Sequence, residues 1–192
     1  MHDPGDSTPS STTTAPADAG AAEAEPPERL SLAVLSEAGD WSAIASHEQA
    51  ITAAAAALAR HPCCASARGA EACIVLADDA LLRSFNRSYR GKDAPTNVLS
   101  FPFQSPPGRR EVRHLGDVVL AAESVRREAA EQGIPPVQHL QHLVVHGLLH
   151  LLGFDHDTDA SANAMERLEA QILATLGIAD PYALAEGGVS VA

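Results

Sequence analysis

The sequence predicts a single α/β domain in which helices pack on a central, mostly parallel sheet. Short apolar stretches typical of buried strands alternate with helical stretches in the first part of the chain, and helices dominate the last part. Apolar residues make up 45% of the 192 residues, which is enough for the core of one domain. Because no apolar run approaches the roughly 20 residues of a membrane helix and no secretory signal is recognisable, we expect a cytoplasmic protein without a membrane partner.

Residues 1–28 are expected to form a disordered acidic tail outside this domain. They are rich in Ser, Thr, Pro and Ala and contain almost no side chains that a core would bury. The domain is expected to span residues 29–183, with a flexible C-terminal tail at 184–192. Three cysteines without metal-binding spacing predict no disulfide framework.

The first half of the domain is expected to alternate strands with helices. Residues 30–35 and 71–78 have the composition of strands, and the second of these is the more apolar. The alanine-rich stretch 46–61 predicts a helix with Ser46 as its N-cap. Residues 78–91 begin with aspartates and end at glycine, which indicates a further helix.

The second half is expected to contain two strands followed by three helices. Residues 96–103 are β-rich with a late proline, which favours a strand near the sheet edge. Residues 104–114 are expected to form a loop with a basic end, and residues 116–122 the next strand. The helices are predicted at residues 123–133, 135–153 and 159–177.

Charge is distributed unevenly along the chain. The net charge of −12, considered alone, argues against a nucleic-acid partner. However, residues 83–127 contain nine of the thirteen basic residues against four acidic ones, a local charge of +5. A basic surface on an acidic protein can bind phosphate; a solvated face without a partner is the alternative.

The stretch HGLLHLLGFDH at residues 146–156 predicts a metal site. His146 and His150 are four residues apart, so both side chains leave the same face of a helix. Gly153 favours the end of that helix, after which the chain can return His156 to the same point. Three protein ligands leave the fourth tetrahedral position of zinc for water, as in catalytic sites. We expect one zinc ion per chain, although other metals accept imidazole and a purely structural histidine cluster is the alternative.

Two neighbours of this stretch are weaker candidates. His142 lies one turn earlier on the same helix face and is expected either to support the site or to lie on the helix surface. Asp155 is expected either to orient a metal ligand or to bond its own loop backbone.

Gly147 separates this pattern from that of the metzincin proteases, H-E-x-x-H-x-x-G-x-x-H. The same histidine and glycine spacing is present, but Gly147 occupies the position of their catalytic glutamate. Glycine is unfavourable inside a helix, so we expect close approach of a substrate or of a neighbouring strand. A protease would need a base from elsewhere, for which Asp117 and Glu123 are the candidates.

Four blocks of the sequence resemble the YbeY-type endoribonucleases, the bacterial rRNA maturation factors. Residues 142–156 are similar to the family signature H-G-x-L-H-L-x-G-[YF]-D-H. Further blocks resemble the family in the right order, so that the likeness covers roughly residues 30–183; these blocks are residues 85–103, 115–121 and 165–182.

The resemblance implies a zinc-dependent, single-strand-specific endoribonuclease. Such an enzyme acts in 16S rRNA 3′-end maturation and in ribosome quality control, with ribosomal RNA and the ribosome or small-subunit assembly proteins as partners and no DNA expected. By position, His146, His150 and His156 match the zinc ligands, and Arg90 matches the arginine considered important for activity.

The residues also support a phosphodiester substrate independently of the resemblance. An arginine such as Arg90 can grip a phosphate with two parallel hydrogen bonds and offset the charge of a transition state. Arg87 and Lys92, nearby in the basic segment, are possible RNA-binding residues, and surface ion pairs are the alternative. Two other functions remain open at this point: a zinc metalloprotease-like hydrolase, and a non-catalytic ribosome-assembly factor with a structural zinc.

Overall fold

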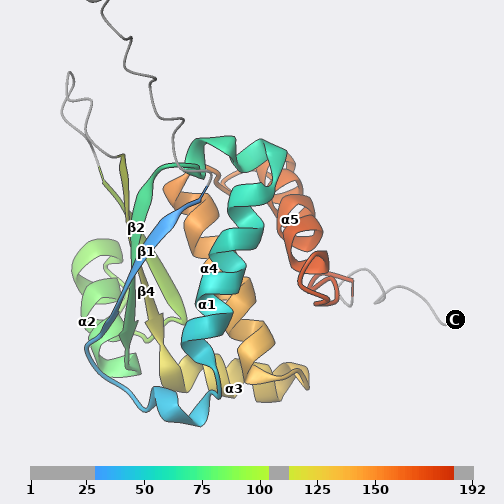
Figure 1. The fold of residues 1–192 in the computed structure, drawn as a ribbon. Coiled ribbons are helices and arrows are strands. Elements are labelled where there is room, and N and C mark those ends of the chain that lie inside the picture. The colour runs from blue at the N-terminus through green and yellow to red at the C-terminus, as the bar shows by residue number, and fades with distance from the viewer. Residues whose placement is uncertain (1–28, 104–112, 184–192) are drawn as a thin grey trace, which may run out of the picture.

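Four strands form a mixed sheet at the centre of the computed structural model (Figure 1). Their order is β1–β2–β4–β3; β2 is parallel to both β1 and β4, and β3 is antiparallel to β4. The predicted α/β fold with a mostly parallel sheet is therefore confirmed, with the proline-containing strand at one edge. The strands span Ser31–Ser36 (β1), Glu71–Ala77 (β2), Val98–Pro102 (β3) and His114–Ala121 (β4).

The structure describes residues 29–103 and 113–183. The predicted tails at 1–28 and 184–192, and most of the predicted loop at 104–114, lie outside these residues. Within the described ranges, none of the helices combines the length and the apolar character needed to cross a membrane.

Helices cover both faces of the sheet. On one face α1 and α4 pack directly against the strands and α5 packs on α4, whereas α2 lies on the opposite face (Figure 1). The larger part of the core fills the space under α1 and α4, and a smaller apolar cluster around Leu82 lies under α2. The helices span His47–Arg60 (α1), Asp79–Arg90 (α2), Ala122–Gln132 (α3), Pro136–Leu151 (α4) and Asp159–Ala174 (α5), with short 3-10 helices at Trp41–Ala43 and Pro62–Ala67.

Local signals set the ends of the helices that carry candidate site residues. Asp78 caps α2 by accepting a 2.8 Å hydrogen bond from the Leu81 amide, and Gly91 ends this helix with a left-handed φ of 68°. Pro136 occupies the first position of α4, where its missing amide hydrogen costs nothing. Gly153, with a φ of 93°, follows the end of α4 and turns the chain back.

Two predicted helix boundaries need correction. Ser46 occupies the N-cap position of α1, but its side chain makes no capping bond because its backbone is left-handed, with a φ of 58°. Instead, the His47 amide donates to Ile44 O at the end of the preceding turn. Helix α5 ends at Ala174, three residues before Gly177, because the amides of Thr175, Leu176 and Gly177 bond carbonyls only three residues back.

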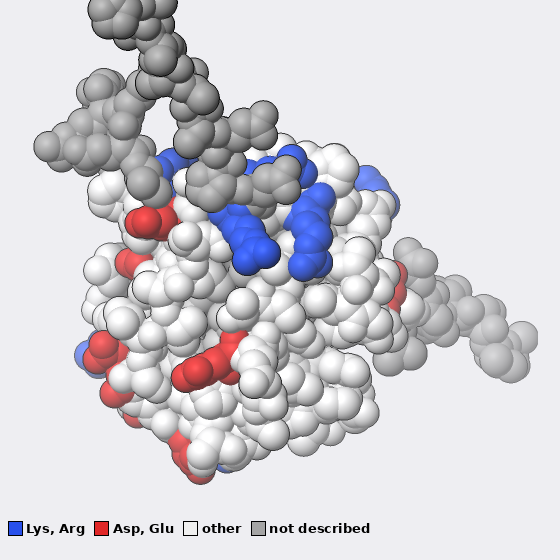
Figure 2. Space-filling view, viewed as in Figure 1, with Lys and Arg blue, Asp and Glu red and all other residues white. Residues whose placement is uncertain are grey.

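Ion pairs occupy part of the predicted basic segment. Arg83 forms a two-pronged pair with Asp93, at 2.8 and 3.0 Å, and Arg127 lies 3.1 Å from Asp79. On the face drawn in Figure 2, Lys and Arg side chains gather toward the top, while Asp and Glu are scattered over the rest. The surface is therefore basic in places, although the net charge of the whole chain is negative.

Candidate metal centre

The three predicted metal ligands lie together at the C-terminal end of α4. His146 and His150 come from successive turns of this helix, and His156 comes from the loop that follows Gly153. One ligand nitrogen from each histidine lies within 4.8 Å of the others. This arrangement is compatible with one metal ion held by three imidazoles.

Hydrogen bonds fix the orientation of two of these rings. His146 Nδ1 lies 2.8 Å from Glu169 Oε1, and His150 Nδ1 lies 3.0 Å from the carbonyl oxygen of Phe154. Because both partners accept, each Nδ1 carries the proton and each Nε2 keeps a free lone pair. The two Nε2 atoms point at one another across 3.1 Å, which directs both lone pairs to one point.

The environment of His150 favours its neutral form. Burial and the neighbouring His146 lower the pKa of His150, although the bond to Phe154 O acts in the opposite direction. A metal ligand must present an unprotonated nitrogen. A lowered pKa therefore makes His150 available for metal binding at neutral pH.

Glu169, a buried carboxylate of α5 beside the histidines, was not predicted from the sequence. Its side chain is only 1% exposed. It accepts hydrogen bonds from His146, from His142 Nε2 at 3.0 Å and from the Tyr182 hydroxyl at 2.5 Å. Burial alone would favour the neutral acid, but the bonds from His142 and His146 outweigh it and lower the pKa of Glu169 to about 2. Glu169 is therefore ionised at neutral pH.

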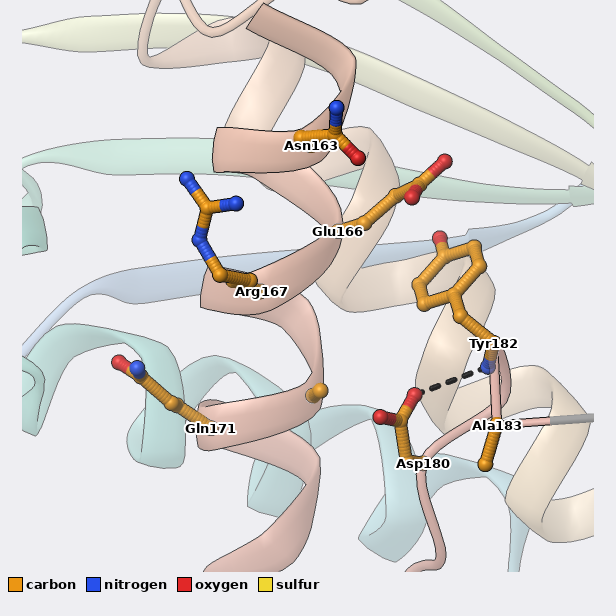
Figure 3. Close-up of a pocket in the computed structure, with 8 residues that line it drawn as sticks. Asn163, Glu166, Arg167, Gln171, Asp180, Tyr182 and Ala183 are labelled. Atoms are coloured by element: carbon orange, nitrogen blue, oxygen red, sulfur yellow. Dashed lines mark hydrogen bonds between the residues drawn. The ribbon is translucent and has the colours of Figure 1, made fainter. Parts of the chain in front are cut away.

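Tyr182 closes this network from the chain segment that follows α5. The Tyr182 amide donates to Asp180 Oδ1 at 2.9 Å, in a turn that brings the ring beside α5 (Figure 3). Burial and the adjacent Glu169 carboxylate raise the pKa of Tyr182, so the phenol stays protonated and donates. A cavity of about 230 Å³ adjoins the ring, and its lining includes His146, His156, Glu166, Glu169 and Tyr182.

The two weaker candidates have different positions. His142 bonds Glu169 and lies 3.3 Å from the Tyr182 hydroxyl, so it belongs to the network behind His146 rather than to the helix surface. Asp155 accepts a 3.3 Å hydrogen bond from the Asp157 amide. Of the two roles considered for Asp155, it therefore has the second, which is to bond the backbone of its own loop. Interactions with Ser161 and the Asp157 backbone lower the pKa of Asp155.

Gly147 allows α4 to pack closely on the sheet. A methyl group added at Gly147 would lie 2.5 Å from Val118 Cγ1 and 3.2 Å from Ser100 Oγ. Ser100 also donates a 3.0 Å hydrogen bond to Gly147 O. The glycine at the protease glutamate position is thus explained by close approach of neighbouring strands.

Neither residue suggested as a protease base accompanies the histidines. Asp117 precedes Val118, and because side chains alternate along a strand, Asp117 faces the side of the sheet away from α4. Glu123 accepts a 3.0 Å hydrogen bond from the Asp79 amide at the start of α2. The carboxylates beside the histidines are instead Glu166 and Glu169.

The structure does not bring Arg90 into contact with the histidines. Arg90 is the exposed last residue of α2, and its neighbour Tyr89 packs against Phe101 of β3, with ring centroids 5.0 Å apart. The residue before Phe101, Ser100, bonds Gly147 on the other side of the same strand. The arginine and the histidines thus flank edge strand β3.

The two possible RNA-binding residues share the end of α2 with Arg90. Arg87 and Lys92 are exposed there. Among the residues that the structure describes, neither they nor Arg90 form an ion pair.

The chain is similar to known proteins over most of its length. The family model described as "Endoribonuclease YbeY" matches residues 39–177. A Parvibaculum lavamentivorans protein named endoribonuclease YbeY is 50% identical over 164 residues, covering 80% of this chain and 85% of its own. An Azorhizobium caulinodans protein of the same name is 52% identical over 164 residues, covering 82% and 100%. The solution structure of TM1509 from Thermotoga maritima shares 19% identity over 76% of this chain and 91% of its own, with a TM-score of 0.43.

The family model covers most of the chain, and the two relatives are about half identical over four fifths of it. The chain therefore belongs to the YbeY endoribonuclease family.

Proposed function

We propose that this protein is a metal-dependent endoribonuclease that acts in 16S rRNA maturation. The observation that carries the proposal is the convergence of His146, His150 and His156 in a chain that belongs to the YbeY family. The curated relatives named above are themselves called endoribonucleases. Ribosomal RNA in the cytoplasm, within the ribosome or beside small-subunit assembly proteins, is the substrate that we assign.

Zinc is the metal that best fits the three ligands. All three are imidazoles, and the Nδ1 partners of His146 and His150 leave the Nε2 atoms free for coordination. A zinc ion with three protein ligands keeps a position open for chemistry. Bound here, it would supply Lewis-acid polarisation of a phosphodiester and acidification of water.

The protein's own residues would hold the ligands and the substrate. Ionised Glu169 keeps the Nδ1 proton on His146, and protonated Tyr182 keeps Glu169 in place. Arg90 is the residue that we assign to the phosphate, because its guanidinium is exposed at the sheet edge that the histidines also flank. Arg87 and Lys92 would hold neighbouring phosphates.

The test combines cleavage with metal analysis on the same samples. Wild type, His150→Ala and Arg90→Ala are incubated with small-subunit precursor RNA, and bound zinc is measured for each. We expect wild type to hold about one zinc and to cleave. His150→Ala should lose both properties, whereas Arg90→Ala should keep zinc and lose cleavage by about 100-fold or more.

Two outcomes would contradict the proposal. Cleavage by metal-free wild type would exclude a metal-dependent mechanism. A zinc-loaded wild type that never cleaves, even when ribosomes are added, would favour an assembly factor with a structural metal.

A further inference from the structure

We propose that an aromatic cavity on the α2 side of the sheet binds an unpaired base of the RNA substrate. This inference rests on the proposed nuclease function and assigns a subsite for it. The cavity has a volume of about 480 Å³ and lies between α2 and the strands. The rings of Phe85, Tyr89 and Phe101 form one wall, and the side chains of Val75 and Val119 form the floor.

The aromatic rings present a surface suited to stacking. Tyr89 lies edge-on to Phe101 at 5.0 Å, and Phe85 lies 5.9 Å from Phe101, so the three rings support one another. Tyr89 is nevertheless 70% exposed. A ring that is held by its neighbours yet open to solvent is the platform on which single-stranded nucleic acids stack their bases.

The charges around the cavity indicate which part of a nucleotide enters it. The acidic groups in its lining are two carboxylates, Glu37 and Asp117, which repel phosphate but can accept hydrogen bonds from the amino groups of a base. The cations Arg87, Arg90 and Lys92 lie outside the lining, at the end of the helix that carries Tyr89. A nucleotide fits this pattern with its base inward and its phosphate outward, whereas an acidic peptide does not.

Strand β3 connects the cavity with the metal centre. Phe101 faces the cavity, and Ser100, the preceding residue, bonds Gly147 next to His146. An RNA strand with one base in the cavity therefore passes Arg90 and crosses the sheet edge toward the histidines. A base engaged in a duplex is not free to stack on Tyr89, which gives the expected preference for single-stranded RNA a structural basis.

The experiment measures binding separately from cleavage. The probe is a short single-stranded oligonucleotide with 2′-O-methyl sugars, which block attack by the 2′-hydroxyl, and one 2-aminopurine, whose fluorescence changes on stacking. Gel analysis after each measurement confirms that the probe is intact, so that binding is read without cleavage. We expect Tyr89→Ala to weaken binding by roughly 5- to 100-fold and to abolish the fluorescence change, because a stacked base contributes that much. Tyr89→Phe should bind as wild type does, and a duplex form of the probe should not distinguish the variants.

Leu35→Ala is the matched control. Leu35 pairs with Val75 across the sheet and exposes an apolar side chain on the same face, but it does not line the cavity. We expect this variant to bind the probe as wild type does. Equal weakening by Leu35→Ala and Tyr89→Ala would overturn the base subsite in favour of a general apolar docking face.

The outcomes separate this proposal from the nuclease proposal. If wild type cleaves RNA but Tyr89→Ala binds the probe unchanged, the base subsite is wrong and the nuclease proposal stands. If binding depends on the ring but zinc-loaded wild type never cleaves, the subsite stands and the nuclease proposal fails. Thermal unfolding of each variant checks folding, and little loss is expected from truncating an exposed ring.

Discussion

Glu169 gives His146 its orientation, and it does so from a different helix. The carboxylate bonds Nδ1 of the ring and is itself held by His142 and Tyr182. Such partners of metal-ligating histidines fix the ring and raise its basicity. The orientation of His146 therefore depends on three other side chains, Glu169, His142 and Tyr182.

Replacing Glu169 by glutamine tests this dependence. Glu169→Gln keeps the shape of the side chain but removes its charge, so we expect metal affinity to fall by about 10- to 100-fold. Competition with a chelator of known affinity measures the loss.

Glu128→Gln is the matched control for this variant. Glu128 of α3 bonds His139 of α4 at 2.8 Å, and neither residue belongs to the histidine cluster of the candidate metal centre. Its loss should leave metal affinity unchanged. Equal losses of metal affinity in Glu169→Gln and Glu128→Gln would contradict a specific role of Glu169, because they would show that removing either histidine–glutamate pair weakens metal binding.

The site residues that could be predicted from the sequence are those that lie close together in the chain. His146, His150 and His156 lie within eleven residues, so helix spacing and one glycine suffice to bring them together. Glu169 and Tyr182 come from later segments, and only the packing of α5 on α4 places them at the site. One signal was available, because Glu169 interrupts the otherwise apolar face formed by Met165, Leu168 and Ile172.

Among the elements, α4 is the one whose position matters most for the site. It carries two of the proposed metal ligands, His146 and His150, and the lack of a side chain at Gly147 allows its close contact with the sheet. Val118, the nearest neighbour, is fully buried and has a restricted rotamer, so it has little freedom to move away. The distance between α4 and β4 is thus fixed by this one pair.

Gly147→Ala should therefore destabilise the protein, although alanine is the better helix former. Overpacking costs about 1–3 kcal/mol, and the gain in helix propensity offsets about 1 kcal/mol. We expect a net loss of up to about 2 kcal/mol, which lowers Tm by up to roughly 8 °C. In a Val118→Ala background most of this loss should disappear, because only the 3.2 Å approach to Ser100 Oγ remains, and persistence of the full loss there would contradict the packing explanation.

The elements themselves were largely predictable, because their end signals act within a few residues. Asp78 and Gly91 bound α2 as expected. Ser46 shows where such reasoning fails, since its residue type suits a cap but its left-handed backbone prevents the bond. Backbone conformation at that position is decided by the preceding 3-10 turn rather than by the serine.

For the molecule as a whole, buried carboxylates predict sensitivity to acid. The pKa of Glu169 is about 2 in the folded protein and near its ordinary value of 4.5 when unfolded. At Glu128 burial opposes ionisation, but the bonds from His139 and Asn97 outweigh it, so its pKa is lowered too. Because both values are depressed on folding, their stabilisation is present above pH 4.5 and is lost as the pH falls toward 2.

Denaturation at several pH values checks this prediction. In metal-free protein, the free energy of unfolding should fall between pH 4.5 and about 2, with Glu169 contributing up to about 3 kcal/mol of the loss. Glu169→Gln should show a shallower pH dependence over this interval. An unchanged slope in that variant would mean that other groups govern acid stability.

The whole-molecule arrangement also explains why Arg90 was the hardest residue to place from sequence. Its position in the chain matches the family pattern, yet α2 lies on the face of the sheet opposite α4. Because β3 lies at the edge of the sheet, one RNA strand can contact both Arg90 on one face and the histidines on the other.

Successive residues of β3 serve the two faces of the sheet, Ser100 toward the metal ligands and Phe101 toward the aromatic cavity. The proposed base subsite and the proposed metal centre therefore lie on opposite sides of one strand. We expect an RNA strand that binds at both to be cut at a constant number of nucleotides from the bound base. An insertion of one residue in β3 before Ser100 would exchange the faces of Ser100 and Phe101, and we expect it to abolish this constant spacing.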